Sequence, residues 1–262
     1  ENVTRVKECA PIYPDYTDIT IPYNIAPLNF MIEGAEGLQV TAYGDTDSLR
    51  ISGKDKARFP IGKWKKLLLQ QKGKSVQVRV TALMKGKWLE YPSFQWQVAA
   101  EAIDGYLSYR LIEPGYEVWN NLQLCERSLE DFSEKVIADN KLTGGNCMNC
   151  HTYGKQSGRL SMFHLRGKNG GTILNRDGKL RKLSLKNDSM ISAAVYGDFH
   201  PSGRYAVFSS NIIIPAFHAQ GSKRLEVYDT ESDLAIADLE QNRMILSPLT
   251  RDKKVLETFP TF

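Results

Sequence analysis

Phe199-His200-Pro201-Ser202-Gly203-Arg204-Tyr205-Ala206-Val207-Phe208-Ser209-Ser210 predicts two β-strands joined by a tight turn. Pro201 presets the backbone for the turn, and Gly203 tolerates the positive φ that a turn often requires. Further along, Arg224–Ser232 predicts a third strand and Leu234–Leu239 a fourth. Four short antiparallel strands are typical of one blade of a β-propeller.

The region just before this stretch predicts another pair of strands. Gly171–Leu174 and Lys179–Leu183 flank Asn175–Gly178. Asp177-Gly178 at its end is a preferred pair for a two-residue hairpin turn. We therefore expect β-structure throughout residues 166–262.

Cys147-Met148-Asn149-Cys150-His151 precedes these strands and has the Cys-x-x-Cys-His spacing of a c-type haem attachment site. The two thiols would bond the haem vinyl groups, and His151 would ligate the iron. The alternative is that Cys147 and Cys150 form a disulfide or stay reduced. Zinc is disfavoured because His151, adjacent to Cys150, cannot readily reach the same metal and no second cysteine pair completes a tetrahedral set.

Three residues are candidates for the sixth haem ligand. Met162 and His164 follow the motif closely enough to reach the opposite face of the haem, and His218 is a third candidate. We favour His164, because Arg166 and a glycine-rich turn follow it and would neutralise the haem propionates. Each also has a structural interpretation: Met162 as core filler, and His164 as a side chain bonded to the backbone.

Residues from about 18 to 100 alternate between apolar and polar side chains, and turn residues separate the segments. Short strands of this kind predict an antiparallel, immunoglobulin-like β-sandwich over residues 1–105. The apolar sets that recur at every second residue are Leu38, Val40 and Ala42; Val76, Val78 and Val80; and Phe94, Trp96 and Val98. The basic stretch Lys63–Lys74 is interpreted as a solvated face over a core stripe.

Residues 106–165 are predicted to form a connector that carries the haem motif. Within it, Ser128 and Asp131 resemble a helix capping box, and Leu129, Phe132, Val136 and Ile137 recur at helical spacing. We therefore expect a short helix that ends near Asn140.

Composition and charge exclude several classes. The 262 residues are 42% hydrophobic and 24% charged, and the net charge of +4 is spread along the chain, which gives no support for nucleic-acid binding. No run of 18 apolar residues predicts a membrane-spanning segment. No leader is recognised at the start, so we expect an export signal to have been removed, with an anchor upstream of Glu1 left open. Cys9 and Cys125 either pair or remain free thiols, and pairing would fit an oxidising compartment.

Phe199–Asp238 resembles the blades of TolB-like β-propellers, whose repeat has a Pro-x-Gly turn between its first two strands and Tyr-Asp at the end of its third. Ser202 departs from the aspartate usual in that turn. Thr258–Phe262 is similar to the opening of a further blade, so we expect the missing blades to come from absent residues or another chain. With the haem motif, the chain resembles exported or outer-membrane-associated propeller proteins of the Bacteroidetes type.

The resemblance and the motif together imply a periplasmic or outer-membrane-associated protein that carries covalent haem c for electron transfer or haem-based sensing, with a redox or cell-envelope protein as partner. A rival hypothesis is a non-redox envelope binding or assembly module in which Cys147 and Cys150 form a structural disulfide. A third is an enzyme with an open haem site, such as a peroxidase. No catalytic constellation is recognised in the sequence, so we expect no catalytic residues.

Overall fold

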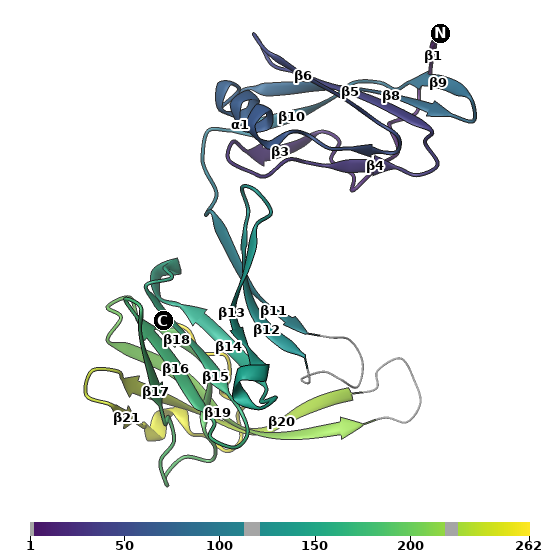
Figure 1. Cartoon of the computed structure of the whole chain (residues 1–262). Coiled ribbons are helices and arrows are strands. Elements are labelled where there is room, and N and C mark those ends of the chain that lie inside the picture. The colour runs from purple at the N-terminus through teal and green to yellow at the C-terminus, as the bar shows by residue number, and fades with distance from the viewer. Residues whose placement is uncertain (1–2, 113–120, 218–224) are drawn as a thin grey trace. The chain divides into compact units, whose positions relative to one another are not determined.

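The computed structural model describes residues 3–112, 121–217 and 225–262. It is mostly β-structure (Figure 1) and divides into two compact units. Unit 1 comprises Glu1–Tyr109 and Glu126–Lys135, and unit 2 comprises Arg110–Cys125 and Val136–Phe262. Within the described ranges, no helix has the length and apolar character needed to span a bilayer.

Unit 1 contains a seven-stranded sheet built around one long strand. β8 (Ser75–Met84) pairs with β5 (Gly37–Tyr43), β9 (Lys87–Glu90) and β10 (Phe94–Ala99). β6 (Ser48–Gly53) extends the sheet from β5, whereas β1 (Val3–Arg5) and β3 (Ile19–Pro22) lie parallel to β9 and β10. Because two of its pairs are parallel, the purely antiparallel immunoglobulin-like arrangement expected from the sequence is wrong at these edges.

One hydrophobic core joins this sheet to the rest of unit 1. The second sheet consists of β2 (Ile12–Tyr13), β4 (Phe30–Ile32) and β7 (Lys56–Ala57), and helix α1 (Ile61–Gln70) packs on the same core. The predicted alternation is confirmed, since the side chains of all three apolar sets are buried. Trp64 and Leu68 of α1 are also buried, while Lys63 and Lys66 face solvent or lie at the surface. The basic stretch is therefore a solvated face over a core stripe, as predicted.

A three-stranded sheet, in the order β11 (Tyr106–Ile112), β12 (Leu122–Ser128) and β13 (Glu134–Asp139), connects the units in sequence. The predicted helix over 128–140 is wrong, because these residues form a turn and β13, and only a 3₁₀ turn, Asn140–Thr143, follows. Phe132 has φ 66°, which no α-helix accommodates. Asp131 accepts hydrogen bonds from the backbone and side chain of Ser133 in the turn, which lowers its pKa to about 2.

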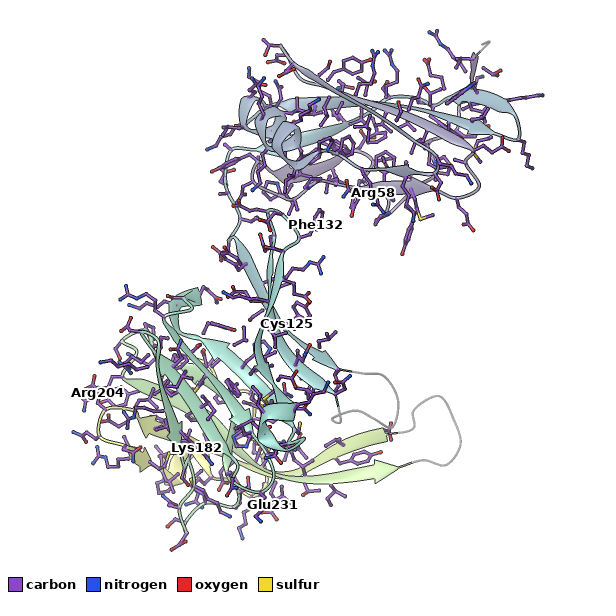
Figure 2. All side chains as sticks on the ribbon, in the orientation of Figure 1. Arg58, Cys125, Phe132, Lys182, Arg204 and Glu231 are labelled. Carbon is purple, nitrogen blue, oxygen red and sulfur yellow. The ribbon has the colours of Figure 1, made fainter. Side chains whose placement is uncertain are left out.

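Unit 2 contains two four-stranded antiparallel sheets. The first runs in the order β14 (Met148–Tyr153), β15 (Leu160–Leu165), β16 (Gly171–Arg176) and β17 (Lys179–Leu183), and a 3₁₀ turn, Gly154–Gln156, separates β14 from β15. The second runs β18 (Ala194–Phe199), β19 (Tyr205–Phe217), β20 (Leu225–Asp238) and β21 (Arg243–Ile245), followed by a 3₁₀ turn, Pro248–Thr250. Figure 2 shows the side chains that these sheets carry, with Lys182, Arg204 and Glu231 labelled.

The sequence predicted part of these two sheets. The hairpin around Asp177-Gly178 is confirmed, with both turn residues at positive φ. The strands on either side of Pro201–Gly203 are confirmed as β18 and β19. The predicted third and fourth strands, however, are one long strand, β20, and the fourth position is taken by β21.

Two apolar clusters hold unit 2 together. The larger lies between the four-stranded sheets and includes Met162 and Leu174 from the first and Phe208 and Ala235 from the second. The smaller contains Leu122, Met148 and Leu165, with Ile112 and Phe163 packed against it. β15 contributes to both clusters, since alternate residues of a strand face opposite sides of its sheet.

Candidate haem attachment site

The sequence predicted that the Cys-x-x-Cys-His motif lies in a short helical connector. In the structure the motif lies on a β-strand. Cys147 immediately precedes β14, and Cys150 and His151 lie within it. Asn149 is paired with His164 and Thr152 with Met162, so Cys150 and His151 together face the single residue between those partners. Two residues against one define a β-bulge, and Cys150 has the positive φ, 55°, that such irregular positions adopt.

The bulge brings Cys150 against the second sheet of unit 2. Its thiol is partly buried, and this burial raises its pKa, while the backbone N–H of Tyr196 in β18 donates to the sulfur and opposes the shift. Arg166 and Arg110 also act on the thiol in the direction that lowers its pKa. Cys147 and Cys150 are both free thiols and partly exposed, and the raised pKa keeps Cys150 in its protonated form at pH 7.

His151 is held in the form that binds a metal. Burial lowers the pKa of its half-buried imidazole, and the positive charge of Arg110 lowers it further. The ring is therefore neutral at pH 7, with a nitrogen lone pair available. Tyr153, two residues along β14, meets this ring edge-on with 6.2 Å between the ring centroids.

Arg166 reaches the motif from the end of β15. Its backbone N–H donates to the carbonyl of Cys147 at 2.9 Å, and its side chain hydrogen-bonds the hydroxyl of Tyr196. Burial raises the pKa of Tyr196, and the negative charge of an ionised Cys150 would raise it further. The structure thus brings together Cys147, Cys150, His151 and Arg166, four residues that the sequence had predicted for one site.

Arg110 and Tyr196 are members of this cluster that sequence reasoning missed. Arg110 lies in β11, outside the motif and its loop, and carries no local signal of its role. Tyr196 lies in β18 at φ 50°. The only sequence clue to it is that β18 opens the predicted blade in which Phe199 and Pro201–Gly203 were recognised.

The candidates for a sixth ligand differ in their surroundings. His164 is buried, with Nδ1 3.4 Å from the hydroxyl of Thr172, and burial together with Arg166 lowers its pKa to about 4. It lies on β15 beside the motif strand, opposite Asn149. Met162 is only 3% exposed within the larger apolar cluster. His218 lies outside the described residues.

The two remaining cysteines lie in different units. Cys9 is an exposed free thiol of unit 1, so the predicted alternative of a Cys9–Cys125 disulfide is not formed in the structure. Cys125 is buried in β12 (Figure 2). In the part of the chain that the structure describes, no three His, Cys, Asp or Glu side chains gather as a metal-binding group.

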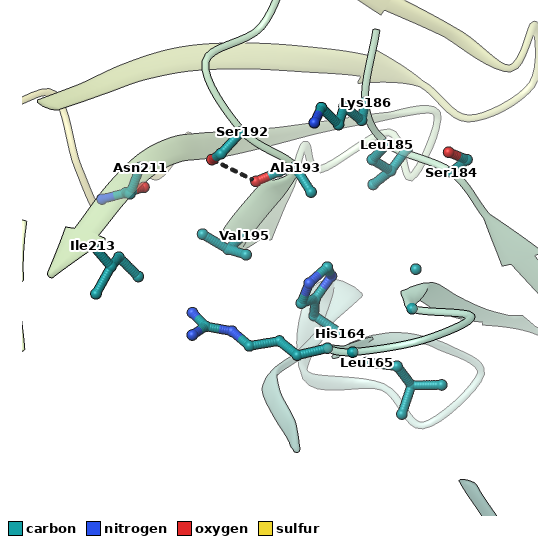
Figure 3. Close-up of a pocket in the computed structure, with 14 residues that line it drawn as sticks. His164, Leu165, Ser184, Leu185, Lys186, Ser192, Ala193, Val195, Asn211 and Ile213 are labelled. Atoms are coloured by element: carbon teal, nitrogen blue, oxygen red, sulfur yellow. Dashed lines mark hydrogen bonds between the residues drawn. The ribbon is translucent and has the colours of Figure 1, made fainter. Parts of the chain in front are cut away.

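His164 also lines a cavity of about 510 Å³ (Figure 3). His164 and Arg166 line it from the first sheet, and Ser192, Val195 and Asn211 line it from the second. His164 of β15 and Arg166, which follows β15, therefore also line a cavity of the size that holds small ligands.

Comparison with known proteins gives little beyond this geometry. No protein-family model matches the chain, and no curated protein matches its sequence. Among solved structures, oligogalacturonate lyase in complex with manganese aligns with 70% of this chain and 67% of its own chain, at 12% sequence identity and a TM-score of 0.29. A TM-score this low supports no inference about fold or activity.

Proposed function

We propose that this chain is an exported monohaem c-type cytochrome-like protein that serves electron transfer or haem-based sensing. The observation that supports this most is that a bulge holds the Cys150 thiol and the neutral imidazole of His151 next to each other, with the free thiol of Cys147 just before the same strand, at the spacing of a haem attachment site. Covalent attachment implies assembly outside the cytoplasm, so we place the protein in the periplasm or at the outer membrane.

The residues present fit haem c. Cys147 and Cys150 would hold it through thioether bonds, and His151 would ligate the iron, which supplies the one-electron chemistry. Arg110 and Arg166 both act electrostatically on the motif and are the groups that would pair with the propionates. The protein's own part is to keep His151 neutral and to hold the two arginines beside it.

His164 remains our choice for the sixth ligand, with Met162 and His218 as alternatives. Its low pKa supports this choice, because a neutral ring can ligate. However, β15 is paired with β14 through Asn149 and His164, so ligation by His164 would require this pairing to change.

For the scaffold, we propose that the two four-stranded sheets are neighbouring blades of a TolB-like propeller, and that unit 1 is related to immunoglobulin-like sandwiches. Support comes from their equal strand number, their antiparallel order along the chain and the turn at Pro201–Gly203. A propeller needs four or more blades, so absent residues or another chain would supply the rest.

A second candidate function is a non-redox envelope binding or assembly module with a structural Cys147–Cys150 disulfide. It is favoured by the apolar side chains that the β19–β20 hairpin exposes. Ile214 and Tyr228, which are paired across the hairpin, are each about half exposed on one face, and Val227 is half exposed on the other, and exposed apolar groups of this kind mark protein contacts.

Visible spectra separate the two functions. The chain would be produced in a periplasm with haem-attachment machinery, denatured to strip loose haem, and recorded oxidised and reduced. We expect a sharp reduced band and a mass increased by one haem, both retained in Cys9→Ser and both lost in the Cys147→Ser, Cys150→Ser double variant. A colourless parent protein with no added mass would contradict the haem proposal, and loss of two hydrogens from its mass would favour the disulfide.

The same preparation tests the axial ligand and the enzyme hypothesis. His164→Gln should change the spectrum toward an open iron site, whereas an unchanged spectrum would exclude His164 as the ligand. Binding of carbon monoxide to the reduced parent protein would instead indicate an open site, as expected for a peroxidase. With both axial positions filled, we expect no such binding.

A further inference from the structure

The cavity between the two four-stranded sheets is positively charged. Arg166 and Lys186 line it, and no aspartate or glutamate is among its described lining residues. His164 also lines it. Two lining cations favour an anionic ligand, and the carboxylate of Asp229, which is not among the lining residues, is bonded to the amide of Asn211.

One residue of the cavity wall carries an unpaired acceptor. Asn211 is 5% exposed, and its amide nitrogen donates to Asp229 at 3.1 Å, which assigns the nitrogen and oxygen of the amide. Its Oδ1 atom is buried and has no hydrogen-bond partner among the described residues, and Asn211 lines the cavity. Figure 3 shows Asn211 beside Ser192 and Ile213 at this wall. A buried carbonyl oxygen left unpaired is costly, and a donor on a ligand would remove that cost.

The rest of the lining suits a compact organic molecule. Leu185, Val195 and Ile213 provide apolar surface, and Ser184 and Ser192 provide hydroxyl groups. A volume of about 510 Å³ lies within the range of small-molecule sites. A bare inorganic ion would leave the apolar surface and Asn211 without contacts.

We propose that this cavity binds a small hydroxylated organic anion, in which a phosphate or carboxylate group pairs with Arg166 and Lys186 and a hydroxyl group donates to Asn211 Oδ1. This site goes beyond haem attachment and does not require haem, although it shares Arg166 and His164 with the proposed haem site. Sugar phosphates and sugar acids share the required chemistry, so the two anionic groups are compared directly.

Isothermal titration of the 262-residue chain with glucose 6-phosphate, glucuronate, inorganic phosphate and glucose tests the proposal. At least one hydroxylated anion should bind, and glucose should bind at least about tenfold more weakly, because it lacks a charge-assisted hydrogen bond. The stronger of the two anions identifies phosphate or carboxylate as the preferred group. Equal binding of glucose and the anions, or no binding of any probe at about 10 mM, would overturn the proposal.

Two variants that leave the haem cluster intact locate the site. Lys186→Gln should weaken binding of the preferred anion about tenfold. Lys179→Gln, which removes an exposed lysine of β17 outside the cavity, is the matched control and should leave binding unchanged. If Lys186→Gln binds as well as the parent protein, this cavity is not the site.

Asn211→Ala tests the acceptor separately from charge. It should weaken the preferred hydroxylated anion about fivefold and leave inorganic phosphate nearly unaffected, since the proposal assigns Asn211 to a hydroxyl group of the ligand's organic part, which inorganic phosphate does not have. A far-UV circular dichroism spectrum checks that the variant is folded. If the variant does not fold, the proposal is still tested by the comparison of glucose with the anions and by the comparison of Lys186→Gln with Lys179→Gln. Equal weakening of phosphate would contradict the assigned role of Asn211.

Discussion

β14 and β18 open the two four-stranded sheets, and each bulges at the same place. In β14 the register shifts between Asn149 and Thr152, and in β18 it shifts between Val195 and Asp198. The third residue of each strand, Cys150 or Tyr196, has φ near 50°. The two bulges also meet, since the backbone of Tyr196 donates to the Cys150 thiol.

The residue after each bulge differs, and so does its consequence. In β14 it is His151, half-buried and neutral beside Arg110. In β18 it is Gly197, pressed against the ring of Phe208. The same kind of β-bulge thus has two roles. In β14 it leaves the side chains of Cys150 and His151 partly exposed, and in β18 it allows Phe208 to pack closely in the core between the sheets.

The largest effect should come from filling the second bulge. A Cβ atom at position 197 would lie 2.4 Å from Phe208 Cε1 and 2.7 Å from Met162 Cε. Gly197→Ala should therefore lower the free energy of unfolding by about 3 kcal/mol through overpacking. Gly158→Ala, where nothing lies within 4 Å, is the control and should change it little. Urea denaturation measures both, and equal stability of the two variants would mean that this bulge has no packing role.

The second largest effect is a pH dependence of stability that arises from His164 in the first sheet. His164, 9% exposed on β15, has a pKa of about 4 in the folded protein, against about 6.5 when unfolded. Between these values the unfolded chain binds a proton that the native state does not, so stability falls as pH decreases. We expect a loss of about 2 kcal/mol from pH 7 to pH 5. His151, whose pKa is also lowered, acts in the same direction.

Asp238 in the second sheet provides the contrast. The hydrogen bond from Arg204 lowers the pKa of Asp238 to about 2, so the contribution of Asp238 to stability is lost only below the ordinary range of an aspartate.

Urea denaturation at pH 7 and pH 5 would be compared for the parent protein, His164→Gln and His151→Gln. The pH dependence should be smallest in His164→Gln. A dependence unchanged by that substitution would show that His164 is already protonated or exposed in the native state.

Contacts between the sheets can be tested by a third pair of variants. Arg176, at the end of β16, donates to the carbonyl of Gly203 in the β18–β19 turn at 2.7 Å. Arg176→Gln should lower the free energy of unfolding by about 1.5 kcal/mol, the usual value for a hydrogen bond to a charged group. Arg159→Gln breaks only an exposed ion pair with Asp177 and should cost less than about 0.5 kcal/mol. Denaturation curves that do not distinguish the two would argue against coupling through Arg176.

The sequence predicted those strands and turns of the two sheets whose pattern lies within a few consecutive residues. Alternating valines such as Val76 and Val78 identify a strand from its own residues, and Asp177-Gly178 identifies its turn in the same way. A bulge breaks the period of two, so Cys150-His151 did not resemble a strand. The sequence predicted separate strands over Arg224–Ser232 and Leu234–Leu239, divided at Asp233, although β20 continues through that residue.

The failures at the site have the same origin. Leu129, Phe132 and Val136 have helical spacing, but Phe132 adopts a left-handed conformation. It lies in a turn in which the backbone N–H of Ser133 donates to Asp131. Arg110 and Tyr196 reach the motif from other strands, so only the fold brings them together. The motif residues themselves were recognisable because attachment chemistry requires them to be adjacent in sequence.

The smallest effect on stability concerns Met162, which lies beside Gly197 in the core between the sheets. Met162→Leu conserves volume and should change the free energy of unfolding by no more than about 1 kcal/mol. Because its side chain packs in that core, we also expect the visible spectrum of the haem-loaded protein to be unchanged. The spectrum carries the information here: a changed spectrum at unchanged stability would make Met162 the sixth ligand, in place of His164, and would mean that the core opens when haem is attached.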